Sequence, residues 1–197
     1  RPSRGSVDVY KRQDRSNSGI AADALSLGNP IVTADLAGSR RAGTSALVSF
    51  KQTNPTTLLL CSDCRDTQPG SVQEMQYGHG AAALLIGEGA PVAEFVSAAS
   101  RHEDLVDQYR ASDSNFDYTL EERWVREEGY FKIVPEVVEE VTAAANLNVA
   151  DVEHIVLHGS SGAARGVAKR LGVSIDRFVD SLASACGDCG AAHPLLM

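Results

Sequence analysis

Cysteine is scarce in this chain, with four among 197 residues. So few thiols argue against a disulfide scaffold, and we expect reduced cysteines and a cytoplasmic location. Long hydrophobic runs are also missing. Gly80–Gly87 is one of the longest, far below the roughly 20 apolar residues that cross a bilayer. We therefore expect no membrane-spanning segment.

Positive charge is also scarce, because 26 acidic residues against 18 basic ones give a formal net charge of −8. An acidic chain is repelled by nucleic acid and by anionic membranes, so neither is an expected partner. Residues 1–13, RPSRGSVDVYKRQ, are basic and lack apolar periodicity. We interpret them as a non-native leader, with a disordered basic tail as the alternative.

A hydrophobic content of 43% is typical of a globular protein with a substantial core. The stretch Ile31–Leu47, IVTADLAGSRRAGTSAL, predicts a strand over Ile31–Asp35, a glycine-bearing turn, and a closely packed helix over Gly43–Gln52. A helix N-terminus after such a turn is where many enzymes hold a nucleophile. This turn has no cysteine and carries Ser39 and Arg40 instead.

Apolar periodicity predicts strands alternating with helices along the rest of the chain. The strands are Thr57–Cys61 (buried on both faces), Tyr77–Glu88, Pro91–Ser100 (a hairpin with the preceding strand) and Asp151–Leu157; the helices are Ile20–Leu27, an amphipathic helix from Leu120 onward, and Ala163–Leu171. This order predicts an α/β fold with a mixed sheet.

Three turns follow predicted strands: Ser39–Gly43, His158–Gly162 and Gly187–Gly190. Ligand sites of α/β sheets gather at such positions. We therefore expect the turns to converge, with Arg40, His158 and Asp188 lining one pocket.

The four cysteines form two C-x-x-C pairs, Cys61/Cys64 and Cys186/Cys189. Paired spacing of this kind also occurs at zinc sites and in redox pairs. Cys61 lies in an apolar strand, where a cysteine is usually a small buried hydrophobe. We expect no bound metal, with zinc or a redox pair as the alternatives.

Six short motifs follow one another along the chain. They are RAGTSAL at Arg41–Leu47, SDCR at Ser62–Arg65, PGS at Pro69–Ser71, YGHGAAALLIG at Tyr77–Gly87, DVEHIVLHG at Asp151–Gly159 and GDCGAAHPLL at Gly187–Leu196. In this order they resemble the thiolase superfamily, and above all 3-hydroxy-3-methylglutaryl-CoA synthases and type III ketoacyl synthases.

The resemblance implies a layered α-β-α-β-α fold of two similar halves, usually dimeric. Residues 14–110 would be the later part of the N-terminal half, and residues 111–197 most of the C-terminal half. We expect a fragment that is incomplete at both ends and not stable by itself. The resemblance also implies acyl-CoA or carrier-bound thioesters as substrates, and no permanently bound cofactor.

Residue by residue, the catalytic cysteine of the superfamily matches Arg40, or Ser39 if the turn shifts by one. The catalytic histidine matches His158, the asparagine falls on Asp188, and an aspartate of the hairpin appears as His79. His158 would stabilise a thioester oxyanion or move a proton. A guanidinium cannot act as a nucleophile, so Arg40 would bind a carboxylate or phosphate, or lie on the surface. Asp188 would act as a base beside His158 or make only local turn contacts.

Two functions remain open at this point. The first is an acyl-CoA enzyme that makes or breaks a carbon–carbon bond without the cysteine, in an aldolase-like or decarboxylating way. The second is a catalytically silent subunit that pairs with an active homologue or an OB-fold protein. The remaining histidines, His79, His102, His154 and His193, are expected to be structural or on the surface.

Overall fold

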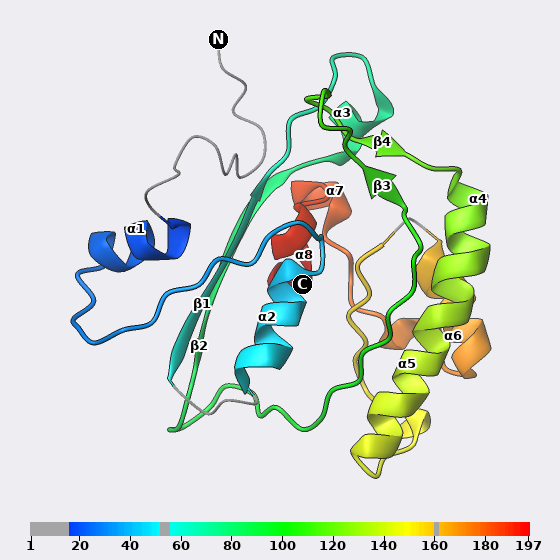
Figure 1. Cartoon of the computed structure of the whole chain (residues 1–197). Coiled ribbons are helices and arrows are strands. Elements are labelled where there is room, and N and C mark those ends of the chain that lie inside the picture. Colours follow the sequence, from blue (N-terminus) through cyan, green and yellow to red (C-terminus); the bar gives the residue numbers. More distant parts are fainter. Residues whose placement is uncertain (1–15, 52–55, 160–161) are drawn as a thin grey trace. The chain divides into compact units, whose positions relative to one another are not determined.

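The computed structural model describes residues 16–51, 56–159 and 162–197 (Figure 1). The chain packs into two compact units. The first holds the described residues up to Asp66, Gly70–Glu88 and Cys186–Leu196. The second holds mainly Gly89–Ala185. This division reflects packing alone, so the expected boundary between related halves at residue 110 stays a prediction.

The first unit is built on an antiparallel hairpin. Its elements are α1 (Asn17–Ala24), α2 (Ala42–Lys51), β1 (Thr57–Cys64), α3 (Val72–Gln76), β2 (His79–Ile86), η5 (Gly190–Ala192) and α8 (His193–Leu196). In the hairpin, Cys61 is opposite Ala82 and Cys64 is opposite His79. The short helix α7 (Ala183–Cys186) connects to this unit through Cys186.

Strand β1 is buried on one face, and the prediction that it is buried on both faces was wrong. Leu59 and Cys61 are buried, whereas Leu58 and Leu60 are 37% and 46% exposed. Successive side chains of a strand point to opposite faces. The helices α2 and η5 pack against β1, so one set of side chains is covered and the alternating set is not.

Two predicted strands do not form. Residues 31–35 and 91–100 are irregular, and β2 pairs with β1 rather than with the segment that follows it. Val32 and Val92 are fully exposed. A strand needs a pairing partner and a face to bury, and among the described residues neither segment has a pairing strand.

Asp35, at the end of one of these segments, caps α1 instead. Its carboxylate oxygens accept the backbone N–H groups of Asn17 at 2.7 Å and Ser18 at 2.8 Å. Ser16 Oγ accepts the N–H of Gly19 at 3.0 Å. These contacts satisfy N–H groups that a helix start leaves without partners. The helix predicted over Ile20–Leu27 therefore begins and ends three residues earlier.

The second unit is mainly helical. Its elements are β3 (Gln108–Tyr109), β4 (Tyr118–Thr119), α4 (Glu122–Trp124), η2 (Val125–Tyr130), α5 (Phe131–Ala144), η3 (Val149–Asp151), α6 (Ala163–Leu171) and η4 (Ile175–Arg177). The core residues are Val125, Ala163, Val167 and Ala168. Helix α6 has the predicted bounds, and the helical region expected from Leu120 is confirmed by α4, η2 and α5.

The acidic face of α5 is a solvated surface. Glu136, Glu139 and Glu140 are exposed, and Arg101 forms ion pairs with Glu136 and Glu140. Pairs of this exposure add little stability. Across the parts of the chain that the structure describes, no helix has both the length and the apolar character that crossing a membrane requires.

The strand predicted over Asp151–Leu157 is reduced to a single parallel bridge between Ile155 and Phe178. Ile155 donates its N–H to Arg177 O at 2.7 Å, and Val179 donates to Ile155 O at 3.0 Å. His158 follows this bridge and is half-buried within the second unit.

Candidate functional site

The turn before α2 presents Arg40 on the first unit. Ser39 Oγ accepts the N–H of Arg41 at 3.1 Å, and the N–H of Ala42 donates to Ser39 O at 3.0 Å. Ser39 therefore has a local role in starting the helix. Residues 31–37 before this turn are irregular, so the prediction that the turn follows a strand was wrong.

Helix α2 packs closely against β1 and η5, as its small residues predict. A Cβ on Gly43 would lie 2.8 Å from the carbonyl oxygen of Ala191 and 2.8 Å from Cys61 Sγ. Cys61 Sγ itself donates to Ala191 O at 3.1 Å. Gly43 thus lets the start of α2 approach both the hairpin and η5.

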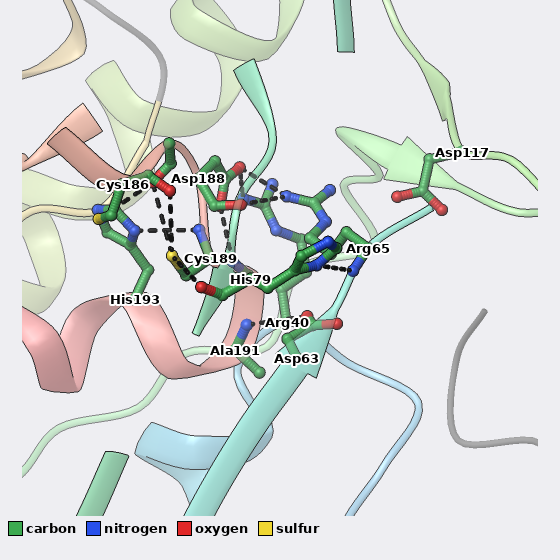
Figure 2. A network of polar contacts seen from close by, with 12 residues as sticks. Arg40, Asp63, Arg65, His79, Asp117, Cys186, Asp188, Cys189, Ala191 and His193 are labelled. Atoms are coloured by element: carbon green, nitrogen blue, oxygen red, sulfur yellow. Dashed lines mark hydrogen bonds and ion pairs between the residues drawn. The ribbon is translucent and has the colours of Figure 1, made fainter. Parts of the chain in front are cut away.

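Asp188 lies at the centre of the polar network on this unit (Figure 2). Its Oδ2 is 2.6 Å from Arg40 Nη2 and 2.8 Å from Arg65 Nη1. Its Oδ1 accepts the N–H of Gly190 at 2.8 Å. One carboxylate therefore accepts from two guanidinium groups and from a backbone amide.

The backbone of Asp188 is fixed by a short parallel pairing with Tyr77. Asp188 donates its N–H to Gln76 O at 2.7 Å, and Gly78 donates to Asp188 O at 3.0 Å. A Cβ on Gly78 would lie 1.8 Å from Cys186 O. The absence of a side chain at Gly78 thus lets the two backbone segments approach closely.

Arg65 is a central member of the network that the sequence analysis did not identify. Its side chain is 4% exposed, and its guanidinium carbon lies 3.3 Å from the centroid of the Tyr77 ring. A buried guanidinium between a carboxylate and an aromatic face is stabilised by both. The SDCR motif, which follows the strand predicted over Thr57–Cys61 and ends on this arginine, is the signal that could have identified it.

Two histidines support this network through their backbone contacts, as the structural interpretation predicts. His79 Nδ1 accepts the N–H of Arg65 at 3.1 Å, and His193 Nδ1 accepts the N–H of Cys189 at 3.1 Å. His193 is 1% exposed. Because each Nδ1 accepts a hydrogen bond, the proton of the neutral ring is on Nε2.

The arrangement limits what Asp188 can do chemically. Both guanidinium groups approach the same oxygen, Oδ2, while the backbone amide of Gly190 occupies Oδ1. A carboxylate has about four acceptor positions, and three are engaged here. Binding of a substrate carboxylate at this place would therefore compete with Asp188 for the same two arginines.

The predicted site residues are partly brought together. Arg40 and Asp188 are in direct contact in the first unit. His158 belongs to the second unit, and the convergence of His158 with the other two stays a prediction.

Cys61 is a buried thiol in the hairpin, as predicted. Burial, together with the negative charge of Asp63, raises the pKa of Cys61. It is therefore a poor nucleophile at neutral pH. Cys64, three residues along β1, is exposed.

Cys186, Cys189 and His193 form a compact cluster, with their ligand-type atoms within 4.8 Å of one another. A metal bound to one nitrogen of a neutral imidazole leaves the proton on the other nitrogen, which then donates. His193 Nδ1 instead accepts a hydrogen bond. The cluster therefore suits thiols better than a metal ion, and the absence of a metal stays a prediction.

The chain is similar in sequence to one kind of curated enzyme. The chain is 26% identical over 167 residues to hydroxymethylglutaryl-CoA synthase of Picrophilus torridus, covering 81% of this chain and 47% of that protein. No protein-family model matches it.

Solved structures give a similar result. 3-Oxoacyl-(acyl carrier protein) synthase III, FabH, from Pseudomonas aeruginosa matches with a TM-score of 0.71 and 19% identity, over 92% of this chain and 61% of that one. A hydroxymethylglutaryl-CoA synthase complexed with CoA matches with a TM-score of 0.66 and 14% identity, over 98% of this chain and 53% of that one.

The chain spans about half the length of the curated relative and somewhat more than half of these solved structures. The expected layered architecture is therefore represented in part. The chain has the thiolase-like fold, and it resembles the hydroxymethylglutaryl-CoA synthases and type III ketoacyl synthases of that superfamily.

Proposed function

We propose that this chain is part of a thiolase-like protein that acts on acyl-CoA or carrier-bound thioesters and makes or breaks a carbon–carbon bond without a cysteine-linked acyl intermediate. The observation that carries the proposal is the ion pair between Arg40 and Asp188. By the motif alignment, Arg40 takes the place of the nucleophilic cysteine, and a guanidinium cannot be acylated at neutral pH.

The remaining groups suit chemistry on a bound thioester. His158 would donate a hydrogen bond to the developing oxyanion or transfer a proton. Arg40 would bind a carboxylate of the acyl group when its pairing with Asp188 opens. Such a site favours aldol-type cleavage or decarboxylation, in which the substrate itself supplies the carbanion. Coenzyme A enters as part of the substrate, and no permanently bound cofactor is proposed.

The same ion pairs also fit a second function, in which they have only a structural role. Asp188 is already bound by Arg40 and Arg65, so these residues would act only as a structural ion-pair cluster. The protein would then be a catalytically silent subunit that pairs with an active homologue or an OB-fold protein.

Turnover assays on the purified protein separate the two functions. We would incubate it with acetyl-CoA, malonyl-CoA and 3-hydroxy-3-methylglutaryl-CoA, follow the thioesters by chromatography, and record the intact protein mass. An enzyme of the proposed kind consumes a thioester with no added protein mass. His158→Ala should abolish this consumption, while His102→Ala, at an exposed position, should leave it unchanged.

Other results would change the assignment. A stable acyl adduct on the unmodified protein would contradict the proposed route. No turnover with any thioester, combined with activity on adding a homologous subunit, would favour the silent subunit.

A double variant tests whether Arg40 occupies the nucleophile position. Arg40→Cys with Asp188→Asn restores the residue types of the superfamily at both places and removes one charge of each sign. We expect this variant to gain an acyl mass from acetyl-CoA on residue 40. A folded double variant that stays unacylated would contradict the alignment at Arg40.

The assembly and location of the protein are further proposals. A homodimer is expected from the resemblance, as is a possible OB-fold partner, and sedimentation of the purified protein tests the dimer. A cytoplasmic location is inferred from the few cysteines. The net negative charge of the chain makes nucleic acid and anionic membrane surfaces unfavourable partners.

A further inference from the structure

The turn between α7 and η5 holds two thiols close together. Cys186 Sγ and Cys189 Sγ lie within 4.8 Å of each other. Cys189 is 0% exposed, and Cys186 is partly exposed at the end of α7. Cys189 Sγ also contacts Cys186 O at 3.5 Å and His79 O at 3.4 Å. The Cys186 thiol is thus accessible to solvent, and the neighbouring Cys189 thiol is buried.

The other C-x-x-C pair has the same spacing and a different geometry. Cys61 and Cys64 belong to the strand β1, so side chains three positions apart point to opposite faces. Cys61 is buried against Ala191 O, and Cys64 is exposed. This pair cannot form an internal disulfide without breaking the strand, which makes it a control within the same chain.

We infer that Cys186 and Cys189 are a dithiol–disulfide pair, a modification site that is oxidised by small-molecule disulfides such as oxidised glutathione. The inference rests on the geometry of this turn and does not depend on the proposed function. Forming the bond requires the two sulfurs to approach to about 2.05 Å. Gly187, between them with a φ of 69°, gives the turn a backbone that other residues rarely adopt.

The reaction proceeds by two exchange steps. The Cys186 thiolate attacks one sulfur of the small disulfide, whose S–S bond breaks, and one small thiolate leaves and takes up a proton. Cys189 then loses its proton and attacks Cys186 Sγ, which releases the second small thiol. The two protein thiols lose two electrons and two protons, and the small disulfide is reduced to two thiols.

The burial of Cys189 gives this pair a characteristic pH dependence. Burial, and next the hydrogen bond and charge of Cys186, raise the pKa of Cys189 to about 11. In the mixed disulfide Cys186 has neither a thiol hydrogen nor a charge, and burial alone keeps the pKa of Cys189 above that of an exposed thiol. Only the thiolate attacks, so ring closure should speed up about tenfold per pH unit across the neutral range. A thiol of high pKa is also a poor leaving group, so the disulfide should resist reduction once formed.

Oxidation would act on the network described above, because Asp188 lies between the two cysteines. The backbone of Asp188 pairs with that of Tyr77, and its carboxylate binds Arg40 and Arg65. A disulfide across this turn would restrain the residue that holds both arginines.

The test uses the purified protein in glutathione buffers of graded redox potential. Samples are quenched with acid, alkylated and mapped by mass spectrometry. We expect a disulfide between Cys186 and Cys189, with Cys61 and Cys64 still alkylated. Cys189→Ser should trap glutathione on Cys186, and Cys64→Ser should leave the wild-type disulfide unchanged.

Several outcomes would overturn the inference. They are full alkylation of all four cysteines in the most oxidising buffer, a disulfide that involves Cys61 or Cys64, and glutathione that stays on Cys186 in the wild type. Stoichiometric zinc bound by the reduced protein and lost in Cys186→Ser would replace it with a metal site. The peptide map of the wild type decides the question even if Cys189→Ser fails to fold.

Discussion

Arg40 Nη2 lies 2.6 Å from Asp188 Oδ2, so two of the three residues that were expected to line one pocket are in direct contact. Arg40 supplies a cation, and Asp188 supplies an anion. Each charge alone would be costly in a partly buried site, and together they form an ion pair. The effect of changing either residue therefore depends on the presence of the other.

Removing the anion should destabilise the first unit. Asp188→Asn leaves the guanidinium groups of Arg40 and Arg65 without their carboxylate, and Arg65 is 4% exposed. Since Asp188 is 22% exposed, solvent offsets part of the loss, and we expect a cost of about 1–3 kcal/mol. Chemical denaturation of the variant and the wild type measures it.

A double-mutant cycle isolates the pair itself. Arg40→Cys combined with Asp188→Asn should cost less than the sum of the single changes, because each single change already removes the contact between positions 40 and 188 and the sum counts it twice. Strict additivity of the two free energies would show that the observed contact contributes no stability.

The contribution of the Tyr77 ring beneath Arg65 to stability should also be measurable. Tyr77→Leu removes the ring that lies 3.3 Å from the guanidinium carbon, and we expect a loss of about 1–2 kcal/mol. Tyr77→Phe keeps the ring and is the matched control, with a much smaller effect. Equal destabilisation by leucine and phenylalanine would mean that the hydroxyl, and not the ring, matters.

Gly78 should tolerate no side chain. A Cβ at this position would lie 1.8 Å from the backbone oxygen of Cys186, and backbone cannot rotate away as a side chain can. Gly78→Ala should therefore cost about 3 kcal/mol, the upper end for overpacking. Gly28→Ala is the control, because a Cβ there would have no neighbour within 4 Å; thermal melting compares the two.

The cap on α1 should make stability depend on pH. Burial alone would raise the pKa of Asp35, but the hydrogen bonds from Ser18 and Asn17 outweigh it, so the net pKa is lowered from 3.8. A carboxyl with a lowered pKa stabilises the fold above its unfolded pKa, and this contribution is lost as pH falls through the folded value.

Replacing Asp35 tests this dependence. Asp35→Ala should cost about 1 kcal/mol at pH 7, a usual value for a lost cap, and the difference from wild type should shrink as the pH falls below about 4. Asp104→Ala, at an exposed position in the second unit, should show no comparable trend. Hydrogen exchange at the amides of Asn17 and Ser18 measures the effect locally.

Local sequence signals predicted the helices better than the strands. Helix α6 was predicted to the residue because Gly162 and Gly172 bound it, both with positive φ. The strand predicted at Ile31–Asp35 failed because its β-branched residues do not reveal that Asp35 caps a helix earlier in the chain. Propensity does not show whether a pairing strand is available.

The sequence predicted that Arg40 and Asp188 would line one pocket, but it did not predict the ion pair between them. Family motifs identified Arg40 and Asp188, but their direct contact follows from the pairing of Tyr77 with Asp188, which no local pattern encodes. Arg65 was missed for the same reason, because its partners Tyr77 and Asp188 come from other segments.

The bridge between Tyr77 and Asp188 has a consequence for the order of folding. The second unit is nearly continuous in sequence, whereas the first needs Cys186–Leu196, which the ribosome makes after Gly89–Ala185. Contacts of long sequence separation form slowly. During synthesis the helices of the second unit should therefore form first. The hairpin should complete its core only later, when Cys189 and Ala192 have been made. Pulse-labelled hydrogen exchange during refolding should show protection in α5 and α6 before protection at Gly78 and Asp188.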